Sequence, residues 1–307
     1  MSKVVVTGVN GFVGKHLVRE LTSYGHAVIG VGLEGVADSE VKDLLHNYIS
    51  QDIAKTWPDL RSSVDAIINL AGLAATGPSF EQPQRYLDIN SAIVTNMCEY
   101  YLKKKQKPRI IMVSSGAIYS PQQTMPLTEE SRIDMNSPYV LSKVLNENQA
   151  GYYRSRDIDI VVARPFNHVG PGQLNGFVVP DLIEKLRHID NLRTIQVGNL
   201  ATKRDYTDVR DVARAYRLLA STPTLNNMTY NICSGKSYAG EEILDILKKL
   251  TNISELHLEV DQSKVRPNDP MDIFGSAEKL HQDTTWEPAI GLEKTLNDCL
   301  NIRALSS

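Results

Sequence analysis

Tyr139 and Lys143 form a Tyr-x-x-x-Lys pair, and on a helix this spacing puts both side chains on one face. A phenol titrates near pH ~10, but an ammonium group four residues on stabilises the phenolate and lowers the phenol pKa. Ser115 ends the apolar run Ile110–Ser115, and its hydroxyl can hydrogen-bond the same substrate oxygen. An isolated pair of this kind would indicate a surface contact on an amphipathic helix. With Ser115 and a glycine-rich turn ahead of it, the pair predicts proton transfer to or from an alcohol while a hydride moves at the same carbon.

The glycine-rich turn has glycines at positions 8, 11 and 14, between an apolar strand and a helix. This context is typical of a dinucleotide-binding turn. Gly8 permits the tight turn, Gly11 lets the backbone approach a pyrophosphate, and Gly14 allows the helix to pack closely on the strand. The pyrophosphate would bind the amides at the helix N-terminus. The Gly-x-x-Gly-x-x-Gly spacing differs from the Gly-x-Gly-x-x-Gly of ordinary dinucleotide dehydrogenases.

Strand and helix patterns alternate through the first half of the chain, which predicts an α/β fold with a doubly wound, Rossmann-type parallel sheet. The predicted strands are Lys3–Thr7, His26–Gly32, Tyr48–Ile53, Asp65–Ala71, Arg109–Ser115 and Asp159–Ala163. The predicted helices are Lys15–Tyr24, Asp88–Lys105 and Pro138–Arg154. The last of these helices carries the Tyr–Lys pair.

After Pro165 the alternation becomes irregular, and a glycine-rich loop follows at 170–176. We expect a Rossmann domain at residues 1–167, to which elements of about 205–235 return. Residues 168–204 and 236–307 would form a smaller, mixed α/β substrate-binding domain. The elements expected in this half are Phe177–His188, Arg193–Gly198, Val209–Ala220, Thr229–Ser234, Gly240–Leu250 and Leu256–Val260.

The composition of the 307 residues is that of an ordinary globular protein, with 42% hydrophobic and 22% charged residues. A formal charge of −3 gives no basic field for nucleic acid, and no apolar run approaches the ~20 residues of a membrane span. The chain enters its first strand at once, so we expect no signal peptide and a cytoplasmic location. The three cysteines lie far apart, which indicates reduced thiols, and no motif suggests a metal site.

The motif Thr7-Gly8-x-x-Gly11-Phe12-x-Gly14, with Ser115 and the Tyr139–Lys143 pair, resembles the extended short-chain dehydrogenase/reductase family that acts on nucleotide sugars. The resemblance covers nearly the whole chain. It implies NAD or NADP as cofactor, a nucleoside-diphosphate sugar as substrate, and Ser115, Tyr139 and Lys143 as catalytic residues. The implied cofactor contacts are Gly8, Asn10, Gly11, Phe12, Val13, Asp52, Ile53, Leu70, Ala71, Gly72, Asn90, Val113, Tyr139, Lys143, Pro165 and Phe166. The implied substrate contacts are Ser115, Asn167, Asn175, Val179, Arg204, Arg266 and Asp269.

Some of these positions have a specific implied role. Asn90 would support the active-site helix, and Asp52 with Ile53 would meet the adenine. Arg204 and Arg266 would hold the substrate diphosphate, since the planar fork of arginine grips phosphate bidentately. For either arginine alone, a surface ion pair is the alternative. His168 could touch the substrate, but a histidine behind the site or in the core is at least as consistent with the sequence.

Within the family, the segments 164–180, 204–212 and 230–235 are most similar to GDP-4-keto-6-deoxy-D-mannose reductases, which form GDP-D-rhamnose. Missing residues narrow the chemistry further. The segment after Ser115 has no carboxylate of the kind that 4,6-dehydratases use. No cysteine adjoins Ser115, and Gly172-Gln173 stands where 3,5-epimerase/reductases have a histidine. Reduction of a 4-keto group and 4-epimerisation remain.

The cofactor and the direction of the reaction stay open. NAD-binding relatives usually have an acidic residue at the end of strand two; here that position is Gly32, and Glu34 is two residues on. No arginine stands there for a 2′-phosphate. A weakly defined ribose pocket suits a cofactor that exchanges at every turnover, which favours a reductase. A 4-epimerase that retains NAD is the alternative. A non-catalytic NAD(P)-binding regulator ranks last, because Tyr139 and Lys143 are both present.

The resemblance also implies a homodimer. In it, the helices Asp88–Lys105 and Pro138–Arg154 would pair into an intermolecular four-helix bundle. An apolar stripe lies at helical spacing on the first of these helices. It consists of Ile93, Val94, Met97 and Tyr101. The alternative is that the stripe faces the sheet of its own chain, and one stripe cannot serve both contacts fully.

Overall fold

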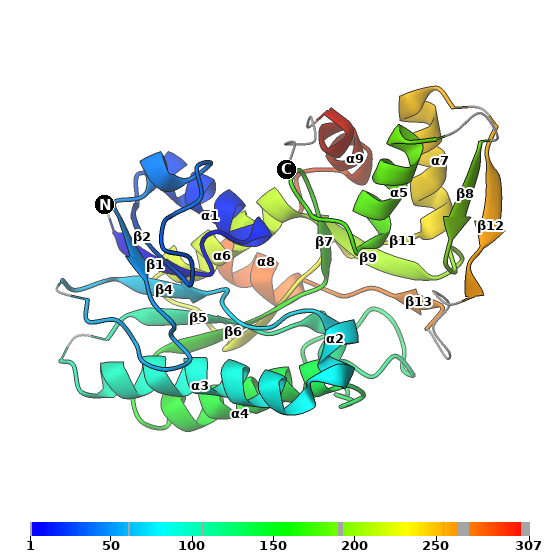
Figure 1. The fold of residues 1–307 in the computed structure, drawn as a ribbon. Coiled ribbons are helices and arrows are strands. Elements are labelled where there is room, and N and C mark those ends of the chain that lie inside the picture. Colours follow the sequence, from blue (N-terminus) through cyan, green and yellow to red (C-terminus); the bar gives the residue numbers. More distant parts are fainter. Residues whose placement is uncertain are drawn as a thin grey trace.

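A sheet of seven parallel strands organises the first part of the chain (Figure 1). The computed structural model describes residues 2–60, 62–105, 107–189, 193–253, 255–262 and 270–301. From edge to edge the strands are β10 (Thr229–Ile232), β6 (Ile160–Pro165), β5 (Arg109–Val113), β4 (Ala66–Asn69), β1 (Lys3–Thr7), β2 (Ala27–Gly32) and β3 (Asn47–Ser50). The predicted doubly wound parallel sheet is therefore confirmed.

Helices cover both faces of this sheet. On one face, α1 (Phe12–Ser23) contacts α6 (Val209–Ser221). On the opposite face, drawn below the sheet in Figure 1, α3 (Pro83–Leu102) contacts α4 (Pro138–Arg154). Side chains of the strands alternate between two apolar clusters, one under each helix pair. Because both faces are buried, the strands read as continuous apolar runs in the sequence.

Local signals set the start of the helices that carry the site. Ser137 caps α4, since its Oγ accepts a hydrogen bond of 3.2 Å from the Val140 amide. Pro138 fills the first turn, where a missing N–H leaves no bond unmade. As a result α4 has the predicted bounds. Helix α1 begins at Phe12 rather than Lys15, and α3 begins at Pro83 rather than Asp88.

The apolar stripe on α3 faces the chain's own sheet. Ile93, Val94, Met97 and Tyr101 are each at most 4% exposed and pack in the cluster that includes Ile67 of β4. The prediction that this stripe forms a dimer contact is therefore wrong. The stripe already stabilises the monomer by burying its apolar surface, so it is not available to a partner.

The second part of the chain has smaller sheets. Strand β9 (Lys203–Asp208) lies between β11 (Ser237–Ala239) and β13 (Asp272–Ile273), and it also pairs with β7 (Asn167–Val169). A further pair joins β8 to β12. These strands and the helices beside them are β8 (Thr194–Val197), β12 (His257–Val260), α5 (Val178–Arg187), α7 (Gly240–Thr251), α8 (Glu278–Thr284) and α9 (Leu292–Asn301).

Helices α5, α7 and α9 pack with β8 around a third apolar cluster, at the end of the molecule away from the N-terminus in Figure 1. β10 and α6 lie with the first sheet, although they follow β7, α5, β8 and β9 in the chain. We propose the division given above, into residues 1–167 with about 205–235, and residues 168–204 with 236–307. One part of the second unit departs from it, since Leu280 of α8 and Trp286 pack in the first apolar cluster, with α6 and β10. Within the described residues, no helix has the length and apolar character needed to cross a membrane.

Candidate active site

The glycine-rich turn fits a bound dinucleotide. Gly8 has a φ of 66°, and a Cβ there would lie 3.1 Å from the Ala71 nitrogen. A Cβ on Gly14 would lie 2.4 Å from the Gly8 oxygen, so α1 packs against the turn only because that position has no side chain. Gly11 is the exposed N-cap of α1. The amides of the first helical turn, beginning with Phe12 and Val13, have no partner within the helix and suit a pyrophosphate.

Ser115, Tyr139 and Lys143 meet at the carboxyl end of the sheet. Ser115 follows β5, and Tyr139 and Lys143 lie in the first two turns of α4 with 8% of each residue exposed. The Lys143 Nζ lies 5.8 Å from the centre of the Tyr139 ring. The Ser115 hydroxyl is close enough to the phenol to act on its pKa as a hydrogen-bond partner. The structure therefore brings the three predicted catalytic residues together.

Burial controls the protonation of this group. It raises the pKa of the Tyr139 phenol, although the hydrogen bond with Ser115 acts in the opposite direction. It also lowers the pKa of Lys143 to about 8, against the attraction of Glu147. The Lys143 Nζ donates to the Val113 carbonyl at 2.9 Å. Desolvation is the largest effect on the phenol in this structure, so its pKa is raised, and the expected lowering of this pKa by Lys143 stays a prediction.

Asn90 holds the active-site helix to the loop after β4 (Ala66–Asn69). It is 2% exposed, and its Oδ1 accepts a hydrogen bond of 2.8 Å from the Leu73 amide. Its Nδ2 donates to the Leu73 carbonyl at 3.1 Å and to the Ser142 hydroxyl of α4 at 2.9 Å. These bonds fit the supporting role implied for Asn90. Its amide is occupied by protein groups, which suits positioning of the site, and its contact with the cofactor stays a prediction.

The end of β4 lies against the glycine-rich turn. The Ala71 amide donates to the Thr7 hydroxyl at 3.1 Å, and that hydroxyl donates to Asn69 Oδ1 at 2.7 Å. Leu70 and Ala71 are partly buried at the sheet edge. Gly72 has a φ of 147°, and a Cβ there would lie 2.8 Å from the Asn90 Oδ1. The backbone at 70–72 is thus fixed beside the turn that would hold the pyrophosphate.

The side expected to meet the adenine contains Asp52 and Ile53. Both residues lie in the turn after β3 (Asn47–Ser50), not in the strand predicted over Tyr48–Ile53, which is a correction. Asp52 Oδ1 accepts from the Ala54 amide at 3.1 Å. Ile53 is 5% exposed, and its carbonyl accepts from Asn96 Nδ2 at 3.0 Å.

Asn10, in the glycine-rich turn, faces the loop after β2 (Ala27–Gly32). Its Nδ2 donates to Glu34 Oε2 at 2.9 Å, and its Oδ1 accepts from the Asp38 amide at 2.9 Å. A Cβ on Gly32 would lie 2.8 Å from the same Glu34 oxygen. The acidic group absent from Gly32 is therefore supplied in space by Glu34. A contact of this carboxylate with the cofactor ribose stays a proposal.

The end of β6 carries Pro165 and Phe166. Phe166 is 7% exposed and packs in one cluster with Tyr139, while Asn167 is exposed at the start of β7. His168 lies behind these residues: its ring stacks on Phe12 with centroids 6.2 Å apart, and burial lowers its pKa. His16, which the sequence did not single out, lies 5.5 Å from Phe12 between ring centroids.

Among the predicted substrate contacts, Asn175 is exposed and Val179 is not. Val179 is 2% exposed inside the cluster of α5, α7 and α9, so its side chain serves the core, and its contact with substrate stays a prediction. Arg204 Nη1 donates to the carbonyls of Lys203 and Pro270 at 2.7 and 2.8 Å. Arg266 and Asp269 lie outside the described residues.

Asp205 lies in the segment 204–212, but the role of its side chain was not predicted from the sequence. Asp205 is 1% exposed, and its carboxylate accepts from the Ser234 amide at 2.7 Å, the Ser234 hydroxyl at 2.6 Å and the Gly235 amide at 3.0 Å. It therefore ties β9 to the segment after β10. Arg164 plays a similar part, because it pairs with Glu147 of α4 at 2.7 Å. The roles of Asp205 and Arg164 follow from their burial and their hydrogen-bond partners. Both of these become visible only in the folded structure, so the sequence carries no signal for them.

A family model, the NAD dependent epimerase/dehydratase family, matches residues 4–233 of the chain. The chain belongs to this family. A GDP-6-deoxy-D-mannose reductase from Pseudomonas aeruginosa is 29% identical, over 97% of this chain and 96% of that protein. A UDP-glucose 4-epimerase from Pisum sativum is 27% identical, over 97% and 95%. The structure of RMD from Pseudomonas aeruginosa complexed with NADPH is 29% identical, has a TM-score of 0.79 and covers 98% of both chains.

As an extended short-chain dehydrogenase/reductase of this family, the protein is an NAD(P)-dependent enzyme of the oxidoreductase type. Cys233 shares the apolar cluster of Tyr139, a proximity that the sequence did not indicate. Burial raises the pKa of its thiol well above the ordinary value, so this cysteine is suited to packing and not to proton transfer. Across the described residues, no group of three or more His, Cys, Asp or Glu side chains is arranged to hold a metal ion.

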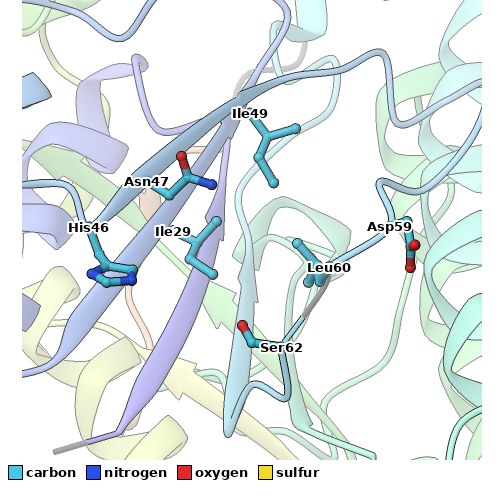
Figure 2. Close-up of a pocket in the computed structure, with 7 residues that line it drawn as sticks. All are labelled: Ile29, His46, Asn47, Ile49, Asp59, Leu60 and Ser62. Carbon is cyan, nitrogen blue, oxygen red and sulfur yellow. The ribbon is translucent and has the colours of Figure 1, made fainter.

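A surface pocket lies apart from this site (Figure 2). It is formed by β2, β3 and the loop before β4. Its lining residues are Ile29, His46, Asn47, Ile49, Asp59, Leu60 and Ser62. None of the predicted catalytic, cofactor or substrate residues is among them, so this pocket is separate from the predicted site.

Proposed function

We propose that the protein reduces the 4-keto group of a nucleoside-diphosphate 4-keto-6-deoxyhexose with NADH or NADPH. The first candidate is GDP-4-keto-6-deoxy-D-mannose, with GDP-D-rhamnose as product. The observation that carries the proposal is the meeting of the half-buried Ser115 with the buried Tyr139 and Lys143, beside the glycine-rich turn. The similarity to a GDP-6-deoxy-D-mannose reductase supports the choice of sugar.

The geometry supports the following division of roles. Reduction of a ketone adds a hydride to carbon and a proton to oxygen, and the bound nicotinamide supplies the hydride. The Tyr139 phenol is protonated at neutral pH, because an ordinary phenol titrates near pH ~10 and burial raises this pKa further, and it gives its proton to the carbonyl oxygen. Ser115 donates a hydrogen bond to the same oxygen and polarises the carbonyl. Lys143, as an ammonium, stabilises the phenolate that remains and binds the nicotinamide ribose.

The groups near the site favour this reaction over related ones. The segment Gly116–Tyr119, which follows Ser115, has no carboxylate that could act in a dehydration. The Cys233 thiol has a raised pKa and does not suit the acid–base role of a 3,5-epimerase cysteine. Within the described residues, Arg204 is the candidate for holding the substrate diphosphate, and Arg266 and Asp269 remain predictions.

A 4-epimerase that retains NAD is the second candidate. Two observations favour it: the similarity to a UDP-glucose 4-epimerase, and the Glu34 carboxylate at the ribose end of the cofactor site. An epimerase uses the same tyrosine in both directions and consumes no cofactor. The reductase ranks first because the segments 164–180, 204–212 and 230–235 are most similar to GDP-4-keto-6-deoxy-D-mannose reductases.

One experiment separates the two candidates. The purified protein is incubated with GDP- or dTDP-4-keto-6-deoxyhexose and each reduced cofactor, nicotinamide oxidation is followed, and the product is identified by NMR. A reductase gives one equivalent of oxidised cofactor for each 4-hydroxyl formed. In parallel, the protein is denatured and the extract is assayed for bound NAD, and UDP-hexoses are tested for interconversion. If the protein retains NAD, interconverts UDP-hexoses and causes no net oxidation of the reduced cofactor, the epimerase is the correct assignment and the reductase is wrong.

A further inference from the structure

The loop at 33–40 joins β2 to the next segment and carries an unusual charge for its place. It contains Glu34, Asp38 and Glu40 and no lysine or arginine. In dinucleotide-binding folds, an acidic residue about 20 positions after the glycine-rich turn binds the adenosine ribose hydroxyls of NAD, whereas an arginine accommodates the 2′-phosphate of NADP. The charge of this loop therefore bears on the choice between the two cofactors.

The Glu34 carboxylate is fixed at the end of β2. A Cβ placed on Gly32 would lie 2.8 Å from Glu34 Oε2, so the carboxylate fills the space that a side chain at the strand end would take. From the glycine-rich turn, Asn10 Nδ2 donates to this oxygen at 2.9 Å. From β3, the Tyr48 hydroxyl donates to the Glu34 backbone carbonyl at 2.7 Å. Side chain and backbone are thus held from two different elements.

The cations of α1 that reach this loop are paired with its other carboxylates. Lys15 Nζ lies 2.8 Å from Asp38 and 2.7 Å from Glu40, and Arg19 lies 2.7 Å from Glu40. The Lys15 hydrogen bond is the largest cause that lowers the pKa of Asp38 and of Glu40, so both carboxylates are ionised at neutral pH. A 2′-phosphate dianion would meet three carboxylates here and would have to compete for Lys15 and Arg19.

We propose that Glu34 determines cofactor specificity: its carboxylate accepts hydrogen bonds from the adenosine ribose hydroxyls of NAD(H), and its charge excludes the 2′-phosphate of NADP(H). Gly32 makes room for this arrangement, because a Cβ there would lie 2.6 Å from the Tyr48 hydroxyl and 2.8 Å from Glu34 Oε2, so a side chain would press on both groups. The similar RMD structure is complexed with NADPH, so the inference separates this chain from that relative. It concerns the cofactor alone and does not depend on the sugar proposed above.

The test measures dissociation constants for NADH and NADPH by nicotinamide fluorescence, without any sugar. The proteins are the wild type, Glu34→Gln, and the control Asp43→Asn. The control changes the net charge equally, at an exposed residue of the following turn Lys42–Leu44.

We expect the wild type to bind NADH at least about tenfold more tightly than NADPH. Glu34→Gln should weaken NADH binding about tenfold or more and bring the two constants together, because charged acceptors make the stronger hydrogen bonds. Asp43→Asn should keep the wild-type ratio.

Three results would overturn the proposal. The first is that the wild type binds NADPH as tightly as NADH or more tightly. The second is that the ratio of the NADPH and NADH dissociation constants is unchanged in Glu34→Gln. The third is that this ratio falls equally in Glu34→Gln and in Asp43→Asn. Because Glu34 is exposed, its replacement by glutamine removes no core contact. Binding is read without turnover, so the outcome is independent of the proposed reaction. A protein that prefers NADH through Glu34 but reduces no keto sugar would contradict only the proposed function.

Discussion

At the residue scale, burial sets the protonation of the Tyr139–Lys143 pair before any ligand binds. The phenol is held protonated and the amine is close to losing its charge at physiological pH. Sequence spacing predicted that the two side chains would meet, but not this outcome. Spacing gives proximity along a helix, whereas desolvation depends on which residues cover the pair, and Phe166 and Cys233 come from distant segments.

Tyr139→Phe tests the proton donor. The ring still fills its place in the cluster, so folding and NADH affinity should hold, while turnover should fall about a hundredfold to ten-thousandfold, the usual contribution of general acid catalysis. Steady-state kinetics and a separate cofactor titration measure the two effects. Near-native turnover in this variant would show that another group supplies the proton.

The lowered pKa of Lys143 predicts an alkaline limit to activity. A lysine whose pKa is about 8 carries its charge below that pH and loses it as the pH rises through that value. The kcat/KM for the cofactor, at saturating sugar, should therefore fall about tenfold per pH unit above about 8, since it reports the free enzyme. Lys143→Arg keeps its charge over this range, so whatever activity it retains should lack this limb. If kcat/KM of Lys143→Arg fell in the same way above about pH 8, the fall would have to come from another titrating group.

At the element scale, the sequence predicts best those elements whose ends have local signals. Helix α4 was predicted to the residue, because Ser137 and Pro138 fix its start. Strands β7, β9, β11 and β13 were not predicted, and neither were α2 (Thr76–Glu81), α8 and α9. Strand β9 reads Lys-Arg-Asp-Tyr-Thr-Asp, a polar run without alternation, and it is a strand because segments far away in the sequence pair with it. Glu34 was not predicted to act as the acidic residue at the end of β2. It lies two residues beyond that position in the sequence, and only the structure shows its carboxylate beside Gly32.

Asn90→Ala tests the link between α3 and α4. The change leaves the Leu73 amide and carbonyl without partners and frees Ser142, so we expect a loss of about 2–4 kcal/mol in the free energy of unfolding. Ser91→Ala, one residue on and only partly buried, is the matched control and should change stability by less than about 0.5 kcal/mol. Urea denaturation gives both values. Equal stability of the two variants would mean that Asn90 does not hold the helices together.

At the scale of the whole molecule, the predicted homodimer needs a different surface from the stripe on α3. Helix α4 exposes Leu141, Leu145 and Tyr152, with 40%, 38% and 55% of each residue accessible. Leu141 and Leu145 are one helical turn apart, and Tyr152 lies two turns further on the same side. We propose that a dimer forms through this exposed side of α4.

Leu145→Arg should then convert the dimer to a monomer, because the new charge would be buried without a partner. Leu44→Arg, at an exposed leucine of the turn Lys42–Leu44, is the control and should remain dimeric. Sedimentation velocity at micromolar concentration distinguishes the two states. A monomeric wild type, or a dimeric Leu145→Arg protein, would contradict this surface.

The position of β10 has a consequence for how the chain is made. This strand, which forms the edge of the large sheet beside β6, arrives more than sixty residues after it, and α6, which covers one sheet face, is also late. A nascent chain that has emerged only through residue 167 would have an open strand edge and a bare apolar face where Tyr216 and Tyr230 later pack. Until translation passes β10, this apolar surface and strand edge are exposed, and such surfaces are prone to aggregation. The two halves are therefore expected to mature together, as one folding unit, although the chemistry belongs mainly to the first.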